Sequence, residues 1–161
     1  MSDTIAAPDS VGFGELPPAI NALLQDGVVA YRTDAGRAEA LFRQAVAHAP
    51  DVLATYFCLY KIHTYQGNLS AARADAQAGL ARATALAGWP TDWRAWRPGT
   101  CGGDSEPARF ALYTLKALAF IHLKEGDSAT AEEMLKRLRA LDPQGTVGWP
   151  VIEALLAATR S

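Results

Sequence analysis

One stretch constrains the fold of this chain more than any other: residues 53–86 read LATYFCLYKIHTYQGNLSAARADAQAGLARATAL. Its first half repeats large apolar side chains at helical spacing, and its second half is rich in Ala. We predict two antiparallel helices joined at Gly67-Asn68, because large side chains facing small ones let two helices approach closely. A lone helix pair cannot bury both of its faces, so this pair needs similar neighbours and the fold is predicted to be all-α.

Composition narrows the possible functions of the chain. Half of its 161 residues are apolar, a fifth are charged, and the formal net charge is -2. No basic block is present, which argues against nucleic-acid binding. No apolar run approaches the roughly 18 residues of a membrane span, so we predict no membrane insertion. The N-terminus lacks the basic and apolar regions of a secretory signal, and we predict a cytoplasmic protein.

The first half of the chain predicts a tail followed by two helix pairs. Residues 1–15 are rich in Pro, Gly, Ser and Asp, which is typical of a mobile tail. A helix is predicted to start at Pro17-Pro18 and to run to Tyr31, with Gly27 as either a close-packing point or a weak spot. Asp34 is expected to cap the next helix, over residues 37–49, which Pro50 ends. The central pair then occupies residues 52–87.

The second half predicts an irregular insertion followed by three more helices. Residues 88–107 contain three of the four Trp, three Pro and four Gly, so we predict a long loop, and loops of this length are often functional. Helices are predicted from residue 108, over 130–141 and over 147–159, where the last would cap the array. Residues 16–161 are therefore expected to form a single helical domain.

Apolar residues recur with the same spacing in different parts of the chain. Leu59 precedes Gly67 by eight residues, and Leu118 precedes Gly126 by the same interval. An alanine follows each of these glycines by five residues. In the second helices a further spacing recurs, in the sets Ala38, Phe42, Ala45, Pro50; Ala72, Ala76, Gly79; and Ala131, Leu135, Leu138, Pro143.

These spacings resemble the tetratricopeptide repeat, a helix–turn–helix unit of roughly 34 residues. The resemblance implies a short right-handed α-solenoid with repeats at about 17–50, 51–87 and 108–143, the insertion 88–107 and a capping helix at 146–160. The first repeat follows the pattern loosely. The second lacks the closing proline and is followed by the insertion.

The resemblance also implies a binding surface, because in that family the leading helix of each repeat lines a concave groove for peptides or partner helices. The positions that would line this groove combine aromatic rings with lysines, which can pair with the carboxylates of an acidic partner. They are Phe57, Lys61, Thr64 and Tyr65 in the second repeat and Tyr113, Lys116 and Phe120 in the third. Phe57 and Phe120 have the alternative role of packing between adjacent repeats. Only Asn21 and Lys116 suggest the family's carboxylate clamp, so we do not expect a full clamp.

The Trp-rich insertion has two interpretations. Trp93, Arg94, Trp96 and Arg97 can form a recognition patch, since Trp and Arg dominate binding hot spots and Arg stacks on Trp. Alternatively, at least two of the three tryptophans cover an apolar gap in the array. A lid of this kind can also shape a groove, so the two interpretations are compatible.

The sequence contains no motif that calls for catalysis, a metal or a cofactor. There is no G-x-S-x-G, no H-E-x-x-H and no phosphate-binding loop. His63 and His122 occupy equivalent repeat positions, where packing is the expected role. Cys58 and Cys101 are far apart and lack metal-type spacing, so we expect two free thiols.

We therefore predict a non-catalytic adaptor that binds a protein or peptide, with a homodimer also possible. The first alternative is a dedicated chaperone or assembly factor of a bacterial multiprotein system, similar to the small chaperones of type III secretion. The more distant alternative is a thiol-dependent enzyme or cofactor carrier that uses Cys101 and the Trp-rich loop.

Overall fold

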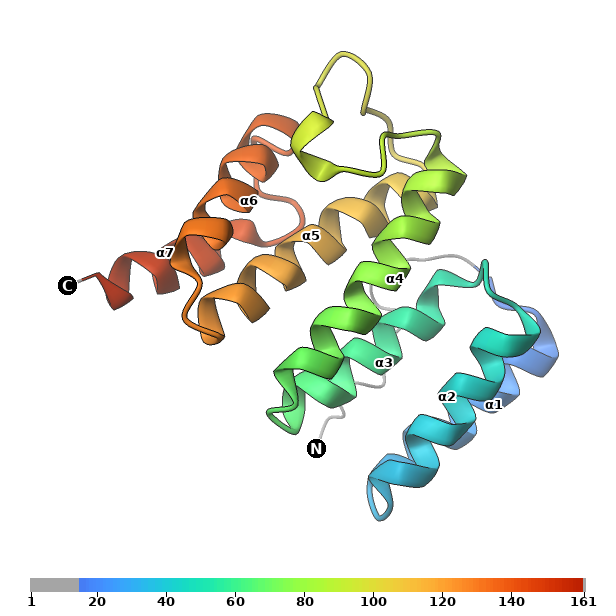
Figure 1. The fold of residues 1–161 in the computed structure, drawn as a ribbon. Coiled ribbons are helices and arrows are strands. Elements are labelled where there is room, and N and C mark those ends of the chain that lie inside the picture. The colour runs from blue at the N-terminus through green and yellow to red at the C-terminus, as the bar shows by residue number, and fades with distance from the viewer. Residues whose placement is uncertain (1–14, 161) are drawn as a thin grey trace. The chain divides into compact units, whose positions relative to one another are not determined.

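A computed structural model describes residues 15–160 of the chain, and their secondary structure is helical, so the fold is all-α as predicted. Figure 1 shows the helices in order along the chain. Within the described residues the chain divides into two compact units, with the boundary between Arg82 and Ala83. The predicted N-terminal tail, residues 1–15, lies outside the described residues apart from Glu15.

The first unit opens with the antiparallel helices α1 (Pro18–Tyr31) and α2 (Ala35–His48). Proline begins α1, and the Asp34 carboxylate caps α2 by accepting a hydrogen bond from the backbone N–H of Arg37 at 3.0 Å. Gly27 is the close-packing point of the pair, because a Cβ added there would lie 2.3 Å from a ring carbon of Phe42. Any side chain at Gly27 would therefore push the two helices apart.

The first unit continues with a second helix pair, α3 (Leu53–Tyr65) and α4 (Leu69–Ala87). The last residues of α4, from Ala83 on, belong to the second unit. Gly67 has a φ of 74°, which closes the turn between them. At the other end of the pair, Arg82 lies 3.1 Å from Asp51, so the two helices run antiparallel. Every residue of α3 from Leu53 to Tyr60 is buried, which makes α3 the core helix of this unit.

The second unit contains the 3-10 helix η3 (Trp93–Ala95) and the helices α5 (Glu106–Lys124) and α6 (Ser128–Leu141). Both α-helices start two residues earlier than the sequence suggested. The reason is local capping: the Ser105 hydroxyl accepts the N–H of Ala108 at 3.3 Å, and Asp127 accepts the N–H of Thr130 at 3.1 Å. The irregular connection therefore ends before residue 106.

The last helix, α7 (Trp149–Thr159), packs against both α5 and α6. Asp142 at the end of α6 organises the loop that leads into it. Its carboxylate oxygens accept the backbone N–H groups of Thr146 and Val147, each at 3.0 Å, and its carbonyl oxygen accepts the indole N–H of Trp149 at 2.7 Å. Three hydrogen bonds to one residue thus fix where α7 begins.

The α3–α4 hairpin and the α5–α6 hairpin have the same turn, 59 residues apart in sequence. The N–H of Asn68 donates to the carbonyl of His63 at 2.8 Å, and the N–H of Asp127 donates to the carbonyl of His122 at 2.8 Å. The intervening glycine has a positive φ in both turns, 74° at Gly67 and 90° at Gly126. The internal repeat in the sequence is therefore also a repeat of backbone geometry.

Candidate binding surface

One face of α5 carries aromatic rings and lysines in alternation. Its members are Tyr113, Lys116, Phe120 and Lys124. The Lys116 ammonium lies 4.3 Å from the centroid of the Tyr113 ring, and the Lys124 ammonium lies 5.9 Å from the centroid of the Phe120 ring. Three of the four, all except Lys124, are groove positions predicted from sequence. Half-buried rings beneath cations combine apolar contact area with positive charge.

The end of this face opens into a hollow between α5 and α7. It has a volume of about 420 Å³ and is lined by Phe120, Leu123 and Lys124 from α5 and by Leu155, Ala158 and Thr159 from α7. Lys124 is the only charged residue among them. Leu155 is 40% exposed, so the hollow is an apolar recess at the surface, large enough for one or two side chains.

The predicted positions on α3 lie together, but they differ in exposure. The Lys61 ammonium lies between two rings, 5.6 Å from the centroid of Phe57 and 5.2 Å from that of Tyr65. Tyr65 is 45% exposed, whereas Phe57 is buried and packs edge-on against Tyr60 at 5.7 Å between centroids. The Thr64 hydroxyl donates to the carbonyl of Tyr60 at 2.6 Å. Lys61 and Tyr65 therefore supply the accessible part of this group.

Two of the three tryptophans of the Trp-rich insertion belong to the core. Trp96 is fully buried and Trp89 nearly so, with their ring centroids 5.0 Å apart. The indole N–H of Trp96 donates to the carbonyl of Pro90 at 2.8 Å, and the carbonyl of Trp96 accepts from Arg137 of α6 at 3.1 Å. In this structure Trp96 fills space beside α6 and offers no surface to a partner, in contrast to the patch that the sequence suggested.

The remaining residues of the predicted patch are closer to the surface. The Arg94 guanidinium stacks 4.3 Å from the centroid of the half-buried Trp93 ring and lies 3.6 Å from Glu133. Arg97 is exposed, but its Nη1 is turned back to the carbonyls of Arg94 at 2.8 Å and Trp96 at 2.9 Å. Among the residues of the predicted patch, Trp93 and Arg94 thus form a stacked ring–guanidinium pair at the surface.

A polar network in the first unit joins three helices, and no local pattern in the sequence indicates it. Arg43 of α2 makes a two-pronged contact with the buried Asp75 of α4, at 2.6 and 2.9 Å, and also bonds Glu39 at 3.0 Å. His63 of α3 lies 3.2 Å from Glu39 and 3.7 Å from Asp75. Residues of α2, α3 and α4 are therefore held to one another through charge-assisted hydrogen bonds.

The network also sets the ionisation of Glu39. Partial burial acts to raise the pKa of Glu39, but hydrogen bonds from Arg43 and His63 outweigh it and hold that pKa below its ordinary value. The pKa of Arg43 is raised, chiefly by its hydrogen bond to Asp75. All contacts of the network are internal to the unit, which fits a role in holding the helices together.

His63 and His122 each contact the residue that immediately precedes the next helix. The Nδ1 atom of His63 lies 3.3 Å from the amide nitrogen of Asn68, and the Nδ1 atom of His122 lies 3.4 Å from the carboxylate of Asp127. Hydrogen bonds from Thr130 hold the pKa of Asp127 below its ordinary value. These histidines link the two helices of a hairpin and do more than fill space.

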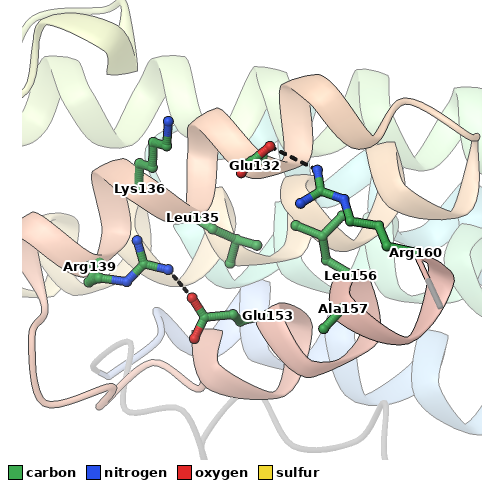
Figure 2. Close-up of a pocket in the computed structure, with 8 residues that line it drawn as sticks. All are labelled: Glu132, Leu135, Lys136, Arg139, Glu153, Leu156, Ala157 and Arg160. Carbon is green, nitrogen blue, oxygen red and sulfur yellow. Dashed lines mark hydrogen bonds and ion pairs between the residues drawn. The ribbon is translucent and has the colours of Figure 1, made fainter.

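A second, smaller hollow lies between α6 and α7 and is crossed by ion pairs. Figure 2 shows Arg139 turned to Glu153 and Arg160 turned to Glu132, the latter at 2.8 Å. The recess has a volume of about 150 Å³ and its floor is formed by leucines of both helices. Because both carboxylates are already paired, this seam ties α7 to α6 and leaves less open space than the hollow beside Phe120.

Both cysteines are free and buried. Burial raises the pKa of the Cys58 thiol to about 12, so it stays protonated at neutral pH and cannot act as a thiolate nucleophile. Cys101 lies in the insertion, 2% exposed, with its sulfur 3.8 Å from the Thr100 hydroxyl. Residues 15–160 hold no group of three or more His, Cys, Asp or Glu placed to bind a metal ion.

Comparisons with protein families, with curated proteins and with solved structures find no match to this chain. Over the described part of the chain, no helix has both the length and the apolar character to cross a membrane.

Proposed function

We propose that this protein is a non-catalytic adaptor that binds a protein or a peptide through the exposed faces of its leading helices. One observation carries the proposal: lysines lie over aromatic rings on both α3 and α5, at Lys61, Lys116 and Lys124. Rings supply contact area at low entropic cost, and the lysines select for acidic partners.

The proposal includes membership of the tetratricopeptide-repeat class. Its support is the repeated hairpin turn, with the same hydrogen bonds and a positive φ at both Gly67 and Gly126. Arrays of such hairpins present preorganised helix faces, so that the partner bears most of the ordering cost of binding. We also place the protein in the cytoplasm, where buried free thiols such as Cys58 and Cys101 are ordinary.

The test is affinity capture from a lysate of the native host, with each captured partner identified, purified and titrated against the variants. Lys61→Glu with Lys116→Glu should weaken an acidic partner by about tenfold or more, because both changes invert the charge beside the rings. Lys136→Glu on α6 is the single-charge control and should bind like the wild type. Retained affinity in a folded double variant would remove the proposed lysine role.

A second variant separates the leading helices from the insertion. Trp93→Ala deletes the ring beneath Arg94 and leaves the buried Trp96 in place. A partner that is retained by Trp93→Ala and lost by the lysine variant supports recognition by the helix faces. The reverse result would move recognition to the insertion.

A further inference from the structure

The hollow between α5 and α7 continues along an apolar stripe on α7. Val151 is 64% exposed and Leu155 is 40% exposed, and they lie one turn apart on the helix. The exposed Ala154 and Ala158 extend the same stripe to the hollow. Large exposed apolar side chains one turn apart form the kind of ridge against which a second helix packs.

The stripe contains no charge that docking would have to desolvate. The only charged residue within α7 is Glu153, and its carboxylate is turned to Arg139 of α6 (Figure 2). A partner helix laid along Val151 and Leu155 would therefore bury apolar surface without stranding a charge from α7.

Charge distinguishes between the possible occupants. Lys124 is the one charged residue that lines the hollow, and among the described residues its side chain makes no ion pair. A second copy placed face to face would bring the same patch with the same positive charge, so neither Lys124 would be neutralised. A helix with carboxylates beside its apolar residues would fill the hollow and pair with Lys124.

We propose that the hollow between α5 and α7, with the stripe of α7, is a docking site for an acidic amphipathic helix of a partner protein. The inference rests on the proposed binding function and names the partner class. An apolar side chain of the partner enters the hollow between Phe120 and Leu155. A carboxylate one turn away on the partner helix meets the Lys124 ammonium at the rim.

The test uses two labelled amphipathic peptides of about 16 residues, with leucines at helical spacing and either glutamates or lysines beside them. Fluorescence anisotropy with the full-length protein should show binding of the glutamate peptide, at least about tenfold tighter than that of the lysine peptide. Equal affinity for the two peptides, or binding of neither, overturns the proposal.

Variants locate the site. Leu155→Ser should weaken the glutamate peptide by about tenfold or more, whereas Leu86→Ser, at another exposed leucine, should not. Lys124→Glu should reverse the peptide preference, and Lys136→Glu, with the same change of charge, should preserve it. Full binding by a folded Leu155→Ser variant overturns the site.

Two further outcomes separate this proposal from its alternatives. A dimer in sedimentation that Leu155→Ser converts to a monomer would assign the face to a second copy and overturn the acidic helix. A captured partner that depends on Lys61 but not on Leu155 or Lys124 would overturn this docking site and leave the general binding function intact.

Discussion

The α3–α4 hairpin of the first unit and the α5–α6 hairpin of the second share one turn but differ beside it. Each has a positive-φ glycine, a histidine four residues before it and the same backbone hydrogen bonds. At equivalent positions of the second helix, however, α4 has the buried Asp75 and α6 has the buried Met134. The first hairpin is held to its neighbour by charge, and the second by apolar packing and the α7 seam.

The difference between the two hairpins separates the role of the turn from the role of the surrounding helices. A glycine and a capping residue determine that two helices reverse direction. They do not determine which interactions hold the hairpin in its unit, because Arg43 and Glu39 come from a different helix. The comparison predicts distinct responses of the two hairpins to mutation, ionic strength and pH.

Truncation of Asp75 and of Met134 should have the largest effects on stability, and for different physical reasons. Met134→Ala should cost about 3 kcal/mol of unfolding free energy, because it leaves a cavity beneath α6. Asp75→Ala should cost about 2 kcal/mol, because it removes a buried partner of Arg43, whose half-exposed guanidinium can still reach water.

Chemical denaturation at low and high ionic strength measures both effects. The cost of Asp75→Ala should shrink at high salt and that of Met134→Ala should not. Equal salt dependence of the two variants would contradict the distinction between a charged and an apolar hairpin.

The α1–α2 pair provides a third kind of contact, based on close approach. Gly27→Ala should destabilise the protein by about 2 kcal/mol, because the methyl group collides with the Phe42 ring, although Ala is the better helix former. Gly36→Ala in the next helix is the matched control, since its nearest neighbour would be an Asp34 oxygen at 3.6 Å, and should change stability little. Thermal unfolding of the two variants is the measurement. A Gly27→Ala variant as stable as the wild type, or more stable, would show that Gly27 only weakens the helix and is not needed for close packing.

The two turn glycines should respond alike. Gly67→Ala and Gly126→Ala should each cost about 1 kcal/mol, because alanine is strained at positive φ. A Cβ at either position would meet nothing within 4 Å, so backbone conformation is the sole cost. Denaturation of the two single variants is the check, and clearly unequal costs would show that the turns are not equivalent.

The smallest expected effect is a pH dependence confined to the first unit. The folded-state pKa of Glu39 lies below its ordinary value, so its stabilising contribution is complete above that ordinary value and is lost as pH falls through the folded value. Stability curves of the wild type and Glu39→Gln should differ at neutral pH and converge in acid. Parallel curves at all pH values would remove Glu39 from the network.

Local signals in the sequence predicted the helices and the turns between them, with errors of about two residues at the starts of α5 and α6. Asp34, Gly67 and Gly126 act at the positions where they occur, because capping and positive φ depend on a few neighbouring residues. The same capping rule, applied to Asp127, would have moved the predicted start of α6 from residue 130 to Ser128. Tyr113, Lys116 and Phe120 were predicted to line a groove; Lys116 lies over the Tyr113 ring and Phe120 lines the hollow, and their binding role stays a prediction.

Contacts between distant residues were not readable in the same way. Arg43 and Asp75 are 32 residues apart, and nothing near either predicts the other. The hollow beside Phe120 depends on where α7 packs, which in turn depends on three hydrogen bonds to Asp142. A Trp-rich segment of sequence does not by itself show which tryptophans are buried. Trp96 can lie in the core because Pro90 and Arg137 form hydrogen bonds with its polar groups.

An NMR titration of the full-length protein with the glutamate peptide tests the central claim most directly. We expect saturable chemical-shift changes concentrated on Phe120, Leu123, Lys124, Leu155 and Ala158. Larger partners are expected to contact Lys61 and Tyr65 as well. Shifts concentrated on Trp93 and Arg94 instead, or no shifts at saturating peptide, would contradict a recognition surface on α5 and α7.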